Sequence, residues 1–284
     1  MRSKAVIVGG VSLALVASLT LVPTAQAVHD PDISALEFKC QTSASKAGVK
    51  FVKAKAKCVD KCVAGARKVP AVEPEANCFP PYGGTAAICI QDALKGAEAK
   101  AIAGVDKACK ELGDGKTDCP ECYADRSGSP DADCSDYGTA LIVDGLSNPS
   151  SASLETQIDA FGFVFCNDNP NTAEETKCES GLAKALVKFV GCKIKCYDKC
   201  KAAAHKGTIA AGACSPPSPS DQTTFDCLFD SLKGCESKAI AAADKACFIA
   251  PADAPECYGF TASSIVSLVE TAIDGNIPNT YCVD

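Results

Sequence analysis

The cysteines of this chain occur twice over in the same order, and this recurrence constrains the fold more than any other feature. The chain has 20 cysteines among 284 residues. Eight positions of the first half have a counterpart in the second half. They are Cys40/Cys178, Cys58/Cys196, Cys62/Cys200, Cys78/Cys214, Cys89/Cys227, Cys109/Cys247, Cys122/Cys257 and Cys166/Cys282. Cysteines this dense and even in number are typical of a disulfide framework formed in an oxidising compartment.

The segments around these cysteines also match each other. Residues 38–64 and 176–202 are identical at 15 of 27 positions, and residues 89–109 and 227–247 are identical at 14 of 21. Both matches have the same offset of 138 residues. We interpret the chain as an internal tandem duplication, in which each half forms one structural unit.

The first 27 residues have the features of an export signal. Basic residues precede an apolar run, a proline ends that run, and small residues follow up to Ala27. We predict cleavage near Ala27, a secreted or periplasmic location, and no transmembrane segment in the mature chain. The predicted organisation is a signal peptide at 1–27, cysteine-rich helical domain 1 at 28–170, and cysteine-rich helical domain 2 at 171–284.

Long stretches rich in Ala, Lys and Glu, with few alternating β-branched residues, predict an all-α fold. We expect two tandem duplicated disulfide-stapled helical domains, each a long antiparallel helical hairpin plus a third, shorter helix. The expected helices cover 35–68, 85–112 and 139–146 with 151–161 in the first domain, and 173–206, 223–248 and 262–274 in the second.

Local signals place several helix ends. A capping box marks the start of each first helix: Ser34 with Glu37, and Thr172 with Glu175. Thr85 and Thr223 are expected to cap the second helices. Arg67 and His205 occupy aligned positions near the ends of the first helices, where a cation interacts favourably with the helix dipole.

Each half also has one pair of cysteines that the other half lacks. The second half adds Cys192 and Cys235, whose counterparts in the first half are Ala54 and Ala97. The first half adds Cys119 and Cys134, which have no cysteine counterparts. Bonded partners are expected to be gained or lost together, so we predict the bridges Cys192–Cys235 and Cys119–Cys134.

The remaining bridges can be approached through the register of an antiparallel helix pair. Residues at one level of such a pair have a constant sum of residue numbers. The sum for Cys192 and Cys235 then predicts Cys200–Cys227, and by repetition Cys62–Cys89. Cys58–Cys78 follows as a third bridge. The pairing of the last four cysteines of each half stays open, with Cys40–Cys109 and Cys122–Cys166 preferred.

The sequence offers little support for an enzyme. It lacks the G-x-S-x-G, H-E-x-x-H and P-loop motifs, and it contains only two histidines. The net charge of −7 excludes a nucleic-acid-binding protein of the usual basic kind. We therefore predict a non-enzymatic binding or structural protein that needs no cofactor. A thiol redox protein that uses the C-x-x-C pair Cys119/Cys122 is a third, weaker hypothesis.

Metal sequestration is the main alternative hypothesis. The cysteines Cys58 and Cys62, and the ladder Cys192, Cys196 and Cys200, are spaced four residues apart and so share a helix face. Free thiols in this arrangement suit soft metal ions such as Cu(I), or Zn²⁺. Export and the joint loss of Cys192 and Cys235 in the first half argue instead for disulfide bonds.

The charge of the chain is unevenly distributed. Residues 38–70 carry nine basic and one acidic side chain, and residues 176–206 carry eight basic and two acidic. Basic helices of this kind can contact an anionic surface or polysaccharide. The lysines assigned to such contacts are Lys46, Lys50, Lys53, Lys57, Lys184, Lys188 and Lys195. The alternative is that the basic helices are neutralised within the protein or simply solvated.

Overall fold

The structure is a computed structural model, and it describes most of the chain after the predicted signal peptide. The described residues are 33–68, 75–109, 172–248 and 258–281, with Pro255 and shorter stretches between 111 and 166. The signal peptide, Cys119, Cys122, Cys257 and Cys282 lie outside the described residues, so the bridges Cys119–Cys134 and Cys122–Cys166 stay predictions.

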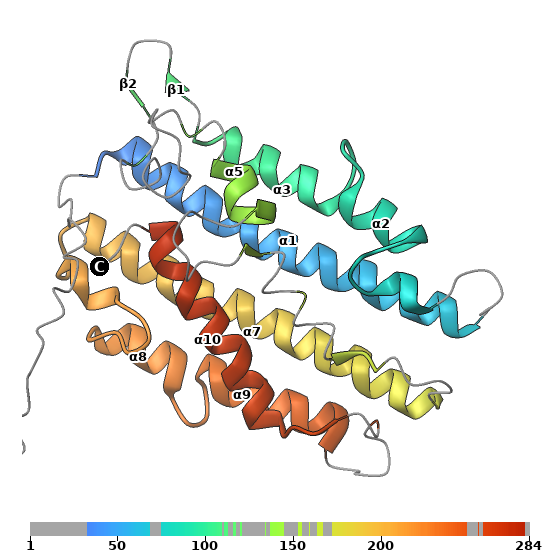
Figure 1. The fold of residues 1–284 in the computed structure, drawn as a ribbon. Helices are drawn as coiled ribbons and strands as arrows, with labels where there is room; N and C mark the ends of the chain where they lie inside the picture. The colour runs from blue at the N-terminus through green and yellow to red at the C-terminus, as the bar shows by residue number, and fades with distance from the viewer. Residues whose placement is uncertain are drawn as a thin grey trace, which may run out of the picture.

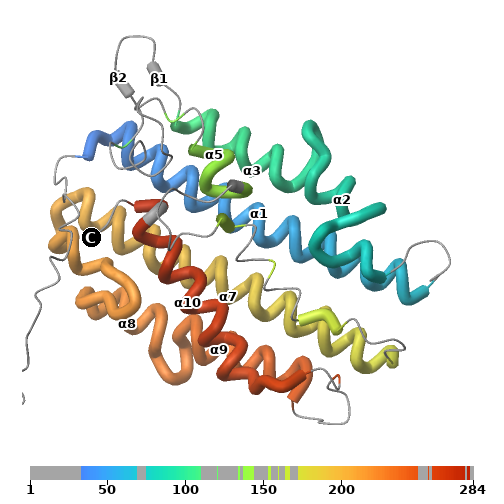
Figure 2. The backbone as a smooth tube through the Cα atoms, in the orientation of Figure 1, coloured from blue at the N-terminus to red at the C-terminus, as the bar shows by residue number. Residues whose placement is uncertain are grey.

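Four helices lie side by side in one layer, and the two longest are in its middle (Figure 1). Helices α1 (Ala35–Lys68) and α7 (Ala173–His205) run antiparallel, flanked by α3 (Ala97–Asp106) and α9 (Cys235–Ala243). Helix α10 (Ala262–Tyr281) packs across α7, α9 and α1 (Figure 2).

Shorter elements complete the fold. They are α2 (Gly84–Gln91), α5 (Tyr137–Thr139) and α8 (Gln222–Phe229); the 3-10 turns Glu75–Cys78 and Ala211–Cys214; the π-helical turns Ala140–Asp144 and Asp244–Phe248; and the strands β1 (Glu111–Leu112) and β2 (Lys116–Thr117). The described residues are therefore all-helical except for this two-residue antiparallel ladder. No described helix is long and apolar enough to cross a membrane.

The predicted capping boxes are present at the starts of α1 and α7. The hydroxyl of Ser34 accepts the Glu37 amide at 3.2 Å, and the Glu37 carboxylate accepts the Ser34 amide at 2.7 Å. Thr172 and Glu175 form the same reciprocal pair. Gly207 ends the second long helix with a φ of +70°, a conformation that glycine adopts without strain. The predicted limits of both long helices are thus confirmed.

The predicted second helix of each half is wrong, because it is broken into two. A turn separates α2 from α3 at Asp92, and an equivalent turn separates α8 from α9 at Asp230. Each aspartate accepts two amides of its own turn, those of Leu94 and Lys95 or those of Leu232 and Lys233. These backbone hydrogen bonds lower the pKa of both carboxyls.

Four further helix limits differ from the sequence expectation, the first being the end of α3 at Asp106 instead of near Leu112, which lies in β1. Gly83 is the N-cap of α2 and Asp221 the N-cap of α8, so Thr85 and Thr223 do not take this place. Asp221 caps α8 because its carboxylate accepts the Thr224 amide at 2.8 Å. Helix α10 starts where predicted but continues to Tyr281, beyond the expected end near 274.

Seven disulfides are fully described, and none of the described cysteines is free. They are Cys40–Cys109, Cys58–Cys89, Cys62–Cys78, Cys178–Cys247, Cys192–Cys235, Cys196–Cys227 and Cys200–Cys214. The predicted bridges Cys192–Cys235 and Cys40–Cys109 are confirmed. The predicted bridges Cys62–Cys89, Cys200–Cys227 and Cys58–Cys78 are wrong, because partners are exchanged by one helical turn.

The broken helices explain this exchange of partners. From Cys235 back to Cys227 the chain covers eight residues, but the partner on α7 advances only from Cys192 to Cys196, four residues. The residues of the turn at Asp230 cover less distance parallel to α7 than the same number of helical residues would. The register sum therefore shifts by four, and the cysteine at 200 is left for Cys214 in the preceding loop.

The core of the described residues is one cluster built from both halves. It includes many alanines and cysteines, with a few large side chains, among them Phe51, Leu141, Leu182, Phe189 and Tyr197. Small side chains bury little apolar area, so disulfides are expected to supply much of the stability.

Candidate functional site

The exposed positions of the two long helices are almost all lysines. From Lys39 to the end of α1, Gly65 is the one exposed residue that is not a lysine; from Lys177 to the end of α7, it is His205. We call this surface the lysine face. It consists of Lys39, Lys46, Lys50, Lys53, Lys57, Lys61 and Lys68 on α1, and Lys177, Lys184, Lys188, Lys195 and Lys199 on α7.

The lysines of both helices point to the same side of the layer. An apolar pocket lies between α1, α7 and α10, and Gly48 and Leu186 are among its lining residues. Gly48 is two residues from both Lys46 and Lys50, and Leu186 is two residues from Lys184. Two residues correspond to about 200° around a helix, so on each helix the lysines face away from the pocket.

A shallow groove of about 350 Å³ lies along the boundary between α1 and α3. Lys46 and Lys50 line it from α1, and Lys100 lines it from α3. The groove also contains the small side chains of Ala47 and Ala97, which leave space between the ammonium groups. Three cations around one depression form a surface suited to an anionic group.

All seven lysines that the sequence assigned to partner contacts are exposed on the lysine face. Three other lysines of the same helices are buried instead: Lys55, Lys193 and Lys201. The sequence did not reveal the role of the two that are most deeply buried. Lys55 is 1% exposed and Lys193 is fully buried. Their signal is positional: both interrupt the apolar face of their helix, about 160° from the lysine stripe.

The buried lysines attach further segments to the long helices. The Lys193 ammonium is 2.6 Å from the Glu270 carboxylate and 2.8 Å from that of Asp274, both on α10. The Lys55 ammonium is 2.6 Å from the Asp159 carboxylate. Burial raises the pKa of Asp274 although Lys193 opposes the shift. These ion pairs thus attach α10 to α7, and Asp159 to α1.

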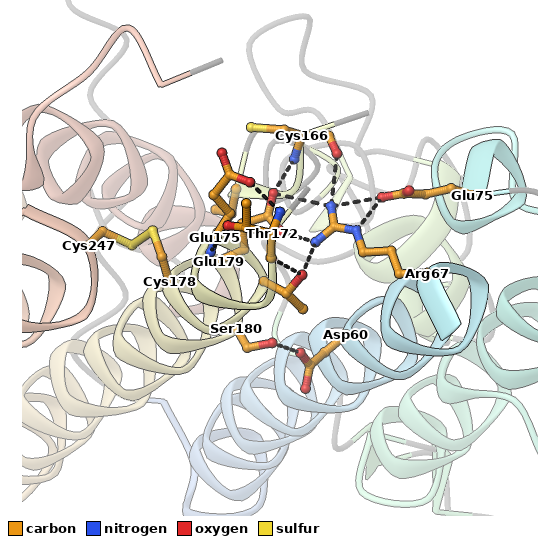
Figure 3. A network of polar contacts seen from close by, with 12 residues as sticks. Asp60, Arg67, Glu75, Cys166, Thr172, Glu175, Cys178, Glu179, Ser180 and Cys247 are labelled. Atoms are coloured by element: carbon orange, nitrogen blue, oxygen red, sulfur yellow. Dashed lines mark hydrogen bonds and ion pairs between the residues drawn. A yellow bond between two sulfur atoms is a disulfide. The ribbon is translucent and has the colours of Figure 1, made fainter. Parts of the chain in front are cut away.

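A polar network joins the end of α1 to the start of α7 (Figure 3). The Arg67 guanidinium is paired with Glu179, which is fully buried, and with Glu75 at 2.8 Å. It also donates to the Thr176 hydroxyl and to the Cys166 carbonyl, both at 3.0 Å. Burial raises the pKa of Glu179 despite the adjacent guanidinium. Arg67 therefore acts as an internal link rather than only as the helix-terminal cation that the sequence predicted.

His205 makes the corresponding contact at the other end of the pair. Its ring stacks on that of Phe38, with 4.4 Å between centroids and 11° between planes. Phe38 and Thr176 occupy aligned positions of the two halves, as do Arg67 and His205. The end of each long helix therefore contacts the equivalent residue at the start of the other.

The cysteines of the metal hypothesis are clustered, but they are already bonded. The sulfurs of Cys192, Cys196 and Cys235 all lie within 4.8 Å of one another. Cys192 is bonded to Cys235, and Cys196 to Cys227. A thiolate for Cu(I) or Zn²⁺ would appear here only after reduction. The redox hypothesis at Cys119 and Cys122 lies outside the described residues.

Comparison with known proteins identifies no relative of this chain. Neither a known protein family, nor a curated protein, nor a solved structure matches it.

Proposed function

We propose that this protein is an exported, non-enzymatic binding protein that uses the lysine face to contact an extended anionic surface. The observation that carries this proposal is the alignment of the lysines of α1 and α7 on one side of the layer. The disulfides and the lack of a membrane-spanning helix among the described residues fit an extracellular protein.

The charge of the whole chain makes the lysine face more significant. The net charge is −7, so a random distribution of the charged side chains would place acidic groups on every part of the protein surface. Among the described residues, two carboxylates of the long helices are near lysines of this face: Asp60 lies 4.0 Å from Lys184, whose side chain is 67% exposed, and the charge of Asp198 interacts with Lys46. An exposed ion pair of this kind contributes little to stability, so the Lys184 ammonium stays available to a partner.

The repetition of the lysines supports the interpretation of a tandem duplication. Lys46, Lys50 and Lys57 have counterparts at an offset of 138 in Lys184, Lys188 and Lys195, and all are exposed. The bridges Cys40–Cys109 and Cys178–Cys247 enclose the same sequence separation of 69 residues. We propose that duplication of one helical unit doubled the area of the basic surface.

The test uses the exported, oxidised protein and vesicles that contain anionic lipid, with neutral vesicles and an acidic polysaccharide as parallel arms. Each lysine near an anionic membrane contributes about 1 kcal/mol. The variant Lys50→Gln/Lys53→Gln/Lys57→Gln should therefore bind roughly 100-fold more weakly to its anionic partner. Binding should also weaken with rising salt.

The control changes the net charge equally on the opposite side of the molecule. Ser263, Ser267 and Thr271 are exposed on α10, and their joint replacement by glutamate also lowers the charge by three. This control should bind nearly as well as the unmodified protein. Equal loss in both variants, or no binding in any anionic arm, would contradict a role for the lysine face.

A further inference from the structure

The apolar pocket between the two halves has the size of a small-molecule site. Its volume is about 450 Å³, within the range of about 300–1,000 Å³ found for ligand pockets. Its walls come from α1, α7 and α10, with Leu141 and Leu154 closing it from the segment between the halves. Residues that are far apart in the sequence thus leave a common space instead of filling it.

The lining selects the chemical class of the ligand. Most lining residues are aliphatic, such as Val52, Leu186, Val190, Ile194 and Ile265. Among the described residues, none that lines the pocket is aromatic or charged. An aliphatic wall favours a flexible hydrocarbon chain over a planar ring system, and it offers no counter-ion to a charged ligand.

One end of the pocket is polar, where Ser45, Asn276 and Thr280 gather around the C-terminal part of α10. The hydroxyl of Ser45 donates to Asp198 at 2.8 Å, and that of Thr280 donates to the Asn276 carbonyl at 3.1 Å. The Ser45 hydroxyl uses its proton inside the protein, so it can act toward a ligand only as an acceptor. A ligand hydroxyl fits this end because it can donate to Ser45, whereas a carboxylate would lie near the charged Asp198.

The pocket is open on the side of α10. Leu268 is 51% exposed, and Thr271 and Gly275, which also line the pocket, are exposed. A ligand can therefore enter between these residues without unfolding the disulfide-bonded layer. We infer that this pocket binds one uncharged molecule with an aliphatic chain and a hydroxyl head, of the class of long-chain alcohols.

The test measures binding of dodecan-1-ol to the full oxidised protein by calorimetry and by the methyl NMR signals of Leu268 and Val269. One molecule should bind per chain. Decan-1-ol should bind roughly 15-fold more weakly, because each buried methylene changes affinity by about fourfold. Dodecanoate at pH 8 should bind at least tenfold more weakly than the alcohol. Tighter binding of dodecanoate would overturn the uncharged class, and no alcohol binding up to its solubility limit would overturn the site.

Two variants separate occupation of the pocket from general effects. Ala272 lines the pocket, so Ala272→Leu should fill part of it and weaken dodecan-1-ol binding at least tenfold. Ala241 is exposed on α9, and Ala241→Leu should bind like the unmodified protein. Equal affinity in both variants would overturn the assignment. The lysine variant Lys50→Gln/Lys53→Gln/Lys57→Gln should keep alcohol binding, so this site and the lysine face can fail independently.

Discussion

Arg67 and Glu179 form an ion pair that joins the last turn of one long helix to the first turns of the other. Glu179 is fully buried, and besides Arg67 it accepts the Cys166 amide at 2.8 Å. A buried carboxylate that loses its cation keeps the full cost of desolvation.

Arg67→Leu is therefore expected to lower the free energy of unfolding by about 3–5 kcal/mol. Lys68→Leu is the matched control, because the neighbouring Lys68 is exposed, and it should change stability by at most about 0.5 kcal/mol. Denaturant unfolding followed by circular dichroism measures both. A small effect of Arg67→Leu would mean that the pair is not essential for joining the two helices.

The buried Lys193 supports a second prediction. Replacing it by methionine preserves much of the side-chain volume but leaves Glu270 and Asp274 without their cation. We expect a loss of about 3–5 kcal/mol. Lys195→Met, on the exposed lysine face, should be nearly neutral. Thermal unfolding compares the two variants, and equal midpoints would show that burial of Lys193 does not decide the docking of α10.

The private bridge Cys192–Cys235 should be dispensable for the fold. Cys192→Ala/Cys235→Ala recreates the alanine pair that the first half has at Ala54 and Ala97. The bridge Cys196–Cys227 already restrains the same loop, so only roughly a dozen residues are newly constrained, and the expected loss is about 3 kcal/mol. A protein that cannot fold after this exchange would contradict the interpretation.

The single variant Cys192→Ala tests the proximity of two bridges. It leaves a Cys235 thiol whose sulfur is 3.5 Å from that of Cys196. The Cys235 thiolate can attack Cys196 Sγ, form Cys196–Cys235 and release Cys227 as the thiolate. Mass mapping of the unreduced protein should find this new bridge and a free thiol at Cys227. A free thiol that stays at Cys235 alone would show that the geometry does not permit exchange.

Buried tyrosines predict a loss of stability in alkali. Burial raises the pKa of Tyr197 and of Tyr258 above the usual value of about 10. Above pH 10 the unfolded chain releases these protons while the folded chain retains them, so the free energy of unfolding falls as pH rises. Tyr197→Phe should reduce this slope by up to about 1.4 kcal/mol per pH unit. An unchanged slope in urea unfolding between pH 10 and 11 would contradict it.

The sequence predicted the features that are determined by residues close together in the chain or by the comparison of its two halves. The capping boxes at Ser34 and Thr172 defined both long helices, and the paired absence of Cys192 and Cys235 identified their bridge. The turn at Asp230 was missed because most of the surrounding residues favour helix. The break depends on the aspartate's two local hydrogen bonds and on Gly234, where a Cβ would lie 2.6 Å from the Asp230 carbonyl oxygen. This break and the equivalent one at Asp92 moved three predicted bridges by one turn.

The site was predicted only in part for a similar reason. The exposed lysines follow from helical periodicity alone, which can be read from the sequence. Whether Lys193 is solvated or paired depends on α10, which lies far away in the chain. The pocket likewise requires three helices to meet, and its lining residues, such as Val52 and Ile265, are indistinguishable in sequence from ordinary core residues.

Lys46 and Gly48 lie on opposite sides of α1, the first exposed on the lysine face and the second lining the pocket. With its lysines against an anionic layer, the molecule would turn α10 and the pocket opening outward, into the surrounding water. The protein would then bind and release its ligand without leaving the surface. Substitutions that change the affinity for the surface would not change the selection of the ligand.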